Sequence, residues 1–144
     1  MKRPTGLVVG LMVALALPTA ALAARRVIHG PAGGGSGTVD ITLVAKNGSV
    51  KKLTRFEFNN IQTVCKGSRT TTSAVSDKFP HTIHVDSDGS FGTKVKVNGG
   101  RVTYTVHGDF KNQNSASGTL RVKGTTPGCG NSDTGTVRWT ATHN

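Results

Sequence analysis

The segment from Val102 to Phe110 reads VTYTVHGDF, and its side chains alternate between two kinds. One parity carries Val102, Tyr104, Val106 and Phe110. The other parity carries Thr103, Thr105, His107 and Asp109. Because successive side chains of a β-strand point to opposite faces, the segment is predicted to be a strand with one buried face. Gly108, which interrupts the apolar parity, indicates a β-bulge.

The same period of two recurs on both sides of this segment. Further strands are predicted around residues 39–46, 91–97, 119–123 and 136–141. Turn signals separate them at Asn47-Gly48, Asp88-Gly89 and Asn98-Gly99-Gly100. We expect Asn47-Gly48 to close a hairpin between residues 39–46 and 49–58. Residues 111–118 and 124–135 read as polar loops.

This spacing of strands and turns is typical of a β-sandwich or a β-barrel. We expect an all-β fold, a single β-sandwich of about seven to eight mostly antiparallel strands over residues 38–144. Six aromatic residues are the core candidates: Phe56, Phe58, Phe91, Tyr104, Phe110 and Trp139. Each could instead be a stacking platform for a ligand. Trp139 shares its parity with Val137 and Ala141, which favours packing.

Residues 1–23 have the features of a secretory signal peptide. Lys2 and Arg3 precede an uncharged apolar run at residues 7–17, and Ala21-Leu22-Ala23 has the form of a cleavage site. A membrane anchor is the alternative, but Pro18 interrupts the run before the roughly 20 residues that a spanning helix needs. We therefore expect a secreted, extracellular protein with no membrane span after cleavage, which can also associate with the cell surface.

Cys65 and Cys129 are the two cysteines of the chain. In an exported protein, such a pair usually forms a disulfide. The alternatives are a reactive thiol or a zinc site, and the absence of a Cys-x-x-Cys pair argues against zinc. We predict one structural disulfide that closes a loop of about 65 residues.

Residues 24–37 are rich in glycine and lie between the leader and the first predicted strand. The run from Gly33 to Gly37 predicts a flexible N-terminal segment. A phosphate-binding glycine loop is the alternative, but the Gly-Lys-Ser/Thr that should follow is missing.

The chain is strongly basic, with 18 Lys and Arg, 7 Asp and Glu, and a formal net charge of +11. Removal of Lys2 and Arg3 with the leader leaves a large positive excess, which attracts polyanions. Five basic residues occupy the polar parity of their predicted strands: Lys94, Lys96, Arg121, Lys123 and Arg138. We expect a partner such as an anionic cell-wall polymer or an acidic polysaccharide. The alternative is that these charges serve solubility and protect strand edges from aggregation.

Sequence-specific nucleic-acid binding is not expected, because no aromatic residue interleaves with the basic set. His107 and Asp109 share one strand face and are the best acid–base candidates. A Gly-x-Ser-x-Gly elbow and paired glutamates are both missing. His81 and His84 should face opposite sides of a strand and so do not form a ready chelating pair. We therefore expect a protein without enzymatic activity or cofactor.

Residues 86–89 (Asp-Ser-Asp-Gly) are similar to a fragment of a calcium-binding loop. Calcium takes six to eight oxygen ligands, and the local sequence provides two carboxylates without a closing glutamate. A hairpin turn is the preferred interpretation. No metal site is expected.

The chain resembles a loose group of small exported proteins of soil actinobacteria and their relatives. The resemblance rests on residues 56–60, 88–91, 118–122 and 135–141 in order with the two cysteines. It implies an exported β-sandwich and transfers no catalytic residue, because the group has no assigned activity. Two other functions remain open: a small secreted hydrolase using His107 and Asp109, and a secreted inhibitor or interaction protein that acts through the loop at 111–118.

Overall fold

A computed structural model describes residues 22–66, 71–126 and 128–144, and the predicted leader therefore lies almost wholly outside the described residues. The described chain is all-β, with ten strands instead of the seven or eight expected. The strands are β1 (Ala24–Pro31), β2 (Thr38–Lys46), β3 (Ser49–Lys66), β4 (Thr71–Lys78), β5 (Ile83–His84), β6 (Ser90–Val97), β7 (Val102–Asn112), β8 (Ser115–Thr126), β9 (Gly130–Asp133) and β10 (Val137–Thr142).

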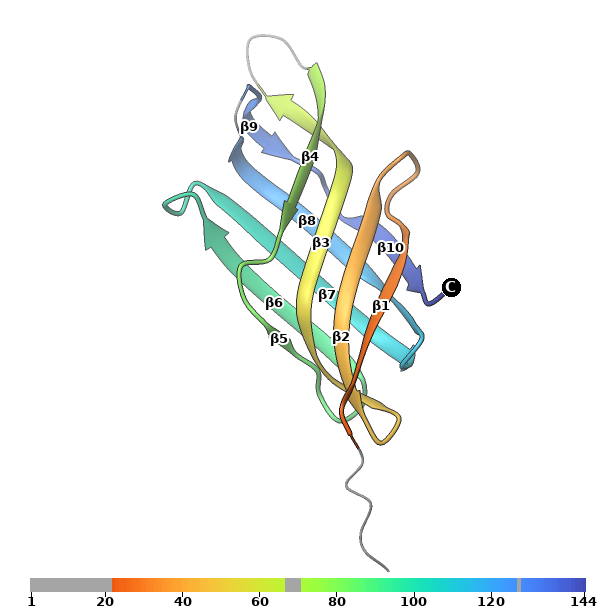
Figure 1. The fold of residues 1–144 in the computed structure, drawn as a ribbon. Coiled ribbons are helices and arrows are strands. Elements are labelled where there is room, and N and C mark those ends of the chain that lie inside the picture. The colour runs from red at the N-terminus through yellow and green to blue at the C-terminus, as the bar shows by residue number, and fades with distance from the viewer. Residues whose placement is uncertain (1–21, 67–70, 127) are drawn as a thin grey trace, which may run out of the picture.

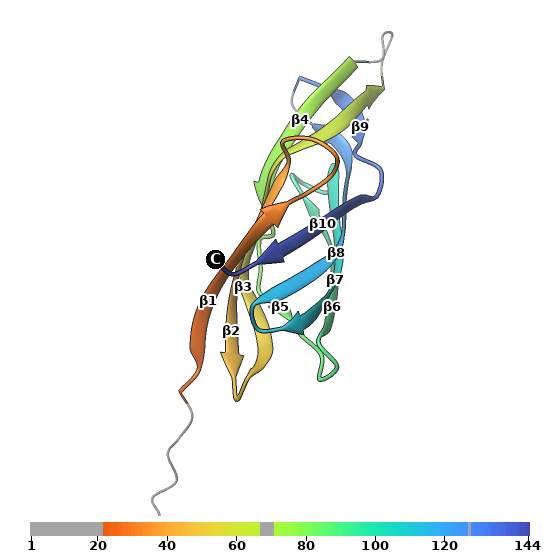
Figure 2. The same ribbon diagram turned by 90° about the vertical axis from the view of Figure 1, so that its right-hand side faces the viewer.

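All strand pairs are antiparallel and belong to one sheet. Its order is β10-β1-β2-β3-β9-β8-β7-β6, and an additional β10–β8 pairing closes part of it into a circuit. β4 and β5 both pair with β3, outside this circuit. Figures 1 and 2 show β1, β2 and β3 on one side of the molecule, facing β6, β7 and β8 on the other.

The core lies between these two groups of strands and is built from the predicted apolar parities. Five of the six aromatic core candidates are buried: Phe56, Phe58, Phe91, Tyr104 and Trp139. Phe110 is only partly buried, and the buried Phe79 was missed because it follows β4 without an alternating pattern. The ring centroids of Phe56 and Trp139 are 5.4 Å apart in an edge-on arrangement, which is favourable for aromatic pairs. Trp139 is therefore a core residue, as predicted.

The predicted hairpin at Asn47-Gly48 is confirmed. Lys46 pairs with Ser49, so the connection between β2 and β3 is a two-residue turn. Asn47 and Gly48 have φ values of 54° and 76°, and two positive φ values suit the right-handed twist of the flanking strands. The turn predicted at Asn98-Gly99-Gly100 likewise connects β6 to β7.

Residues 24–31, which were predicted as part of a flexible segment, instead form β1. This strand pairs with β2 along its whole length and meets β10 at His29. Ile28 is fully buried. A Cβ at Gly30 would lie 2.2 Å from the carbonyl oxygen of Thr140, so this glycine permits the close approach of β1 to β10. The sheet therefore includes residues 24–31, and Gly30 serves strand packing and not chain flexibility.

The bulge predicted at Gly108 is also wrong. Gly108 pairs regularly with Phe91 on one side and with Gly118 on the other, and the register shift of β7 falls after Phe110. Gly118 in turn pairs with Trp139. A Cβ at Gly108 would lie 2.6 Å from the Phe91 ring and 2.8 Å from the Trp139 ring. The glycine leaves room for two large rings.

Two predicted loops are largely strand. The loop expected at 111–118 is a turn at residues 113–114, because β7 continues to Asn112 and β8 begins at Ser115. The loop expected at 124–135 contains the end of β8 and the short strand β9. In both cases polar composition hid the strand, since these residues lie at strand ends with few buried positions.

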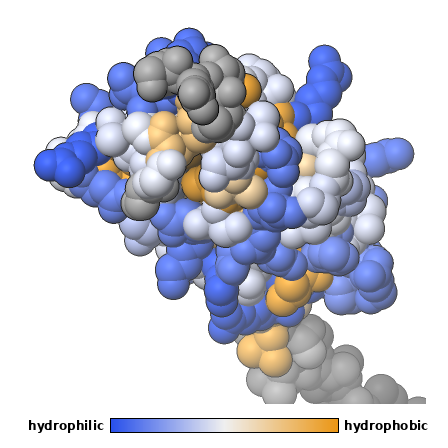
Figure 3. Space-filling view, turned by 90° about the horizontal axis from the view of Figure 1, so that it is seen from above, coloured by the Kyte–Doolittle hydropathy of each residue, from blue (hydrophilic) through white to orange (hydrophobic). Residues whose placement is uncertain are grey.

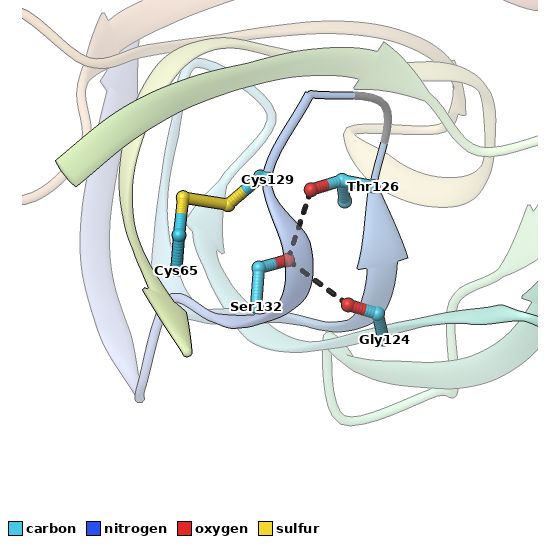
Figure 4. Close-up of a disulfide and its surroundings, with 5 residues drawn as sticks. All are labelled: Cys65, Gly124, Thr126, Cys129 and Ser132. Atoms are coloured by element: carbon cyan, nitrogen blue, oxygen red, sulfur yellow. Dashed lines mark hydrogen bonds between the residues drawn. A yellow bond between two sulfur atoms is a disulfide. The ribbon is translucent and has the colours of Figure 1, made fainter. Parts of the chain in front are cut away.

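The predicted disulfide is confirmed: Cys65 and Cys129 are bonded, with their Cα atoms 5.1 Å apart. Figure 4 shows the bond beside Ser132, whose hydroxyl donates to the carbonyl of Gly124 at 3.1 Å and lies 3.2 Å from the Thr126 hydroxyl. Ser132 pairs with Cys65 across β3 and β9, so covalent and hydrogen bonds hold this end of the sheet together.

The surface seen from above in Figure 3 is mostly hydrophilic, with hydrophobic residues confined to small areas. Among the described large hydrophobic residues, the exposed ones are Leu22, Val27 and Val64. No helix that could cross a membrane occurs in the described part of the chain.

Replacing Gly108 by alanine should destabilise the fold by about 1–3 kcal/mol, because the new methyl group overlaps the rings of Phe91 and Trp139. Gly34→Ala is the matched control, since no atom lies within 4 Å of its added Cβ. Urea unfolding followed by tryptophan fluorescence measures both variants. Equal stability of the two would contradict the packing described for Gly108.

Replacing both cysteines by alanine should lower the free energy of unfolding by about 4 kcal/mol in the chain-entropy model, because Cys65 and Cys129 are 64 residues apart. Thermal unfolding of oxidised protein, reduced protein and the double variant provides the measurement. The reduced protein and the variant should agree, and an unchanged melting temperature would show that the loop constraint is not stabilising.

Candidate functional site

The basic residues of β6 and β8 lie on one exposed face, with β7 between them. Lys94 pairs with Thr105, which pairs with Arg121. The adjacent row runs from Lys96 through Thr103 to Lys123 in the same way. The basic face is defined here as these six residues together with Arg138. Its cations are exposed, and its position follows from two consecutive hairpins that place β7 between the basic strands.

The β-sheet sets the spacing of these cations. Positions two apart on one strand are separated by about 7 Å, and positions on strands two apart by about 10 Å. A groove of about 230 Å³ lies between them, lined by Lys94, Thr103, Thr105, Arg121 and Lys123. Two threonine side chains thus line the middle of the groove, and basic side chains line it on both sides.

Arg138 joins this face from β10. It pairs with Thr119 of β8, two residues from Arg121 along that strand. Arg138 is exposed, because its neighbours in the chain, Val137 and Trp139, point toward the core. All five predicted basic residues therefore share one face, with Lys94, Arg121 and Lys123 lining the groove and Lys96 and Arg138 beside it.

Asp133 is the acidic counterpart of this face. Its carboxylate accepts hydrogen bonds from Arg121 Nε at 2.9 Å and Nη2 at 2.6 Å. These bonds lower the pKa of Asp133 to about 2, helped by an amide hydrogen bond from Gly135 and by the charges of Arg121 and Lys123. Asp133 also pairs with Lys123 across β8 and β9. Arg121 is thereby held in place, with its charge partly neutralised.

The lysines of the basic face are not neutralised in this way. No described carboxylate forms an ion pair with Lys94, Lys96 or Lys123. β6 ends the strand order, so Lys94 and Lys96 also lie on an edge strand, where lysine opposes pairing with another sheet. Attraction of a polyanion and protection of the edge strand are compatible roles for these lysines, since both require an exposed charge.

The acid–base candidates His107 and Asp109 are exposed on the same side of β7. They line a shallow groove of about 330 Å³ with Asp86 and Ser90. No hydrogen bond joins His107 to Asp109 within the described residues. The hydroxyl of Ser90 donates to Asp88 at 2.7 Å, so this potential nucleophile is bonded within its own turn. The groove therefore lacks a connected nucleophile and base.

The turn preferred over a calcium loop at residues 86–89 has the expected local bonds. Asp88 accepts the backbone amide of Ser90 at 2.9 Å as well as its hydroxyl, and these two bonds lower the pKa of Asp88. No group of three potential metal-ligating side chains occurs among the described residues. His81, one of the two histidines considered as a chelating pair, has its Nε2 atom 3.3 Å from the Thr93 hydroxyl.

Two threonines of the basic face and its acidic counterpart, Asp133, were not predicted from the sequence. Thr103 and Thr105 were placed on a polar parity, but their position between two basic strands required the strand order. The strand order β6-β7-β8 could have been predicted from a turn on each side of β7. The turn after β7 was not recognised, because residues 111–118 were interpreted as a loop. Asp133 was hidden because β9 is short and polar.

No family model, no curated protein and no solved structure matches this chain.

Replacing Asp133 by asparagine should remove a pH-dependent part of the stability. Because the folded pKa of Asp133 is about 2, below its ordinary value of 3.8, the ion pair stabilises the fold above pH 4 and is lost as the pH falls toward 2. After screening by solvent, the expected loss at neutral pH is about 1 kcal/mol. Urea unfolding between pH 7 and pH 2 should show the variant and the native protein converging at low pH.

Asp109→Asn is the control, since Asp109 has no ion-pair partner among the described residues. If the free energies of unfolding of the native protein and of Asp133→Asn differed by the same amount at every pH, the ion pair would be excluded as the source of that difference.

Proposed function

We propose that this is a secreted, non-catalytic β-sandwich protein that binds an extracellular polyanion, such as an anionic cell-wall polymer or an acidic polysaccharide. The observation that carries the proposal is the pair of cross-strand rows on the basic face, each with a cation at both ends and a threonine at the centre. Membership of a known family plays no part in it.

The chemistry of the face suits phosphate, sulfate or carboxylate groups. Lys94, Lys96 and Lys123 supply compact positive charges, and attraction by such charges is long-ranged and sensitive to salt. Arg121 is held by Asp133, so its remaining donors are oriented before a ligand arrives. The two threonine hydroxyls can donate to anionic oxygens between the cations.

The shape of the face favours a repeating polymer over a small molecule. The cations of the two rows lie on β6 and β8, with β7 between them, and Arg138 adds a further cation on β10, beside β8. An extended ligand can contact several of them at once, which raises affinity by effective concentration. No aromatic side chain belongs to the basic face, so the interaction would read charge and not nucleic-acid bases.

Location supports the same proposal. A signal peptide at residues 1–23 would deliver the chain to an oxidising compartment, and the Cys65–Cys129 disulfide is compatible with it. A basic protein released there meets the anionic polymers of the cell envelope. Neither the hydrolase nor the inhibitor alternative has a described contact that favours it.

Neutralising two lysines of the basic face should weaken polyanion binding. The variant Lys94→Gln/Lys123→Gln should elute from heparin, and from immobilised anionic cell-wall polymer, at lower salt than the native protein. The slope of log affinity against log salt should become shallower by about 2 if each lysine releases about one counterion.

Lys46→Gln/Lys52→Gln is the matched control, with the same change in charge on β2 and β3. Its elution should stay close to that of the native protein. Equal shifts for the two double variants would attribute retention to net charge alone and end the proposal of a specific face.

A further inference from the structure

A second cavity, of about 410 Å³, lies at one end of the molecule, away from the groove of the basic face. Three connections frame it, together with the strand ends next to them: the β2–β3 turn with residues 48–51, the segment 85–89 before β6, and the β7–β8 turn with residues 110–113, of which 110–112 belong to β7. Figure 1 shows the first two of these connections at the same end of the ribbon. This cavity, with the residues that line it, is called the end cavity below.

The floor of the end cavity is apolar. Val50 is 7% exposed, and Val85 and Phe110 are partly buried against the core. Phe110 is the last residue of the buried parity of β7, and its ring packs on Phe91 with centroids 5.5 Å apart. The ring therefore lies where the core meets solvent, which explains why Phe110 is less buried than the other aromatic residues.

The rim of the end cavity is polar and electrically balanced. Two lysines and two aspartates line it: Lys51, Lys111, Asp86 and Asp88. Asn112 and Gln113 add side-chain amides; the Asn112 oxygen already accepts the backbone amide of Asn114 at 2.8 Å, which leaves its NH2 group as a donor. This balance contrasts with the basic face, where cations outnumber the single carboxylate of Asp133.

The connection at residues 85–89 is held in one conformation by backbone hydrogen bonds. The amide of Asp86 donates to Ser90 O at 2.8 Å, and the amide of Gly89 donates to Asp86 O at 3.0 Å. The amide of Phe110 donates to Gly89 O at 3.0 Å, which fixes the turn to β7. The Asp88 carboxylate is occupied by Ser90, while no described side chain bonds to that of Asp86. The rim is thus preformed, and one carboxylate is available to a ligand.

From this combination we propose that the end cavity binds a neutral saccharide. The apolar floor would take the carbon–hydrogen face of a sugar ring, with Phe110 as its aromatic part. The carboxylate of Asp86 and the amides of Asn112 and Gln113 would bond to hydroxyl groups. The volume is within the range of about 300–1,000 Å³ typical of small-ligand sites.

The surroundings favour a chain of sugars over a single ring. Asp86 also lines the shallow groove of about 330 Å³ that contains His107 and Asp109. The two hollows therefore meet at one side chain, and the second offers further hydrogen-bonding groups. A polyanion is disfavoured because the two carboxylates of the rim offset the charge of its two lysines. A free amino acid would leave most of this connected polar surface unused. The inference is independent of the polyanion proposal and uses none of its residues.

A titration of isotopically labelled protein with neutral sugars, followed by NMR, tests the inference. The probes are cellobiose, maltose and N,N′-diacetylchitobiose, with glycine as a zwitterionic comparison, at up to about 10 mM. At least one sugar should shift the amide signals of residues 48–51, 86–89 and 110–113. These shifts should be unaffected by added salt, because the ligand carries no charge.

Variants locate the site. Asp86→Ala/Gln113→Ala should weaken binding of the best sugar by about tenfold or more, since hydrogen bonds to a charged group are lost. Lys94→Gln/Lys123→Gln, on the basic face, should bind that sugar normally. Phe110→Ala is avoided because the ring also packs on Phe91. The dispersion of the NMR spectrum confirms that each variant is folded.

The outcomes are distinct. Shifts at the three connections that disappear in the end-cavity variant support a saccharide site. No shift with any sugar overturns it, and so do shifts scattered over the surface. A response to glycine alone would replace the saccharide by an amino acid and also overturn it. Loss of heparin binding in the basic-face variant bears on the polyanion proposal only.

Discussion

The packing of two large rings over two glycines is the constraint on which the rest of the structure depends. One buried row runs across four strands, from Trp139 on β10 through Gly118 and Gly108 to Phe91 on β6. The two ring centroids are 6.1 Å apart, above glycines that leave no space for a Cβ. Interiors are close-packed, so a shift by one residue would place a side chain where the rings lie. The row therefore fixes the register of β6, β7, β8 and β10 together.

The register of the buried face determines the exposed face. Because side chains alternate, fixing the Phe91–Gly108–Gly118–Trp139 row also fixes every row on the opposite side. Lys94 is consequently aligned with Thr105 and Arg121, and Arg138 is placed beside them. The same register brings β10 close enough to β1 for Gly30 to meet Thr140, which closes the circuit of strands. Core packing and surface charge are thus two results of one alignment.

The molecule carries two surfaces of different electrostatic character. The basic face is a flat array of cations on regular strands, suited to long-range attraction of a charged polymer. The end cavity is concave, electrically balanced and built from connections between strands. Asp133 and Asp86 illustrate the difference, because the first is tied to Arg121 and has a pKa of about 2, whereas the second faces a cavity without a described partner. Recognition by charge and recognition by shape would therefore occur at separate places.

Local sequence determined the strands that have an alternating pattern, their buried parity and the Asn47-Gly48 turn, because alternation and turn chemistry act over a few residues. It also indicated the Cys65–Cys129 pairing, since only two cysteines exist. The tertiary structure decided what depends on distant neighbours. Gly108 was interpreted as a bulge because its partner ring, Trp139, is far away in sequence. Residues 24–31 were interpreted as flexible because composition does not reveal that the backbone of β10 passes close to Gly30. The pairing of Arg121 with Asp133, and the cavity between three connections, likewise arose only when separate strands were aligned, since contacts across strands leave no mark on local composition.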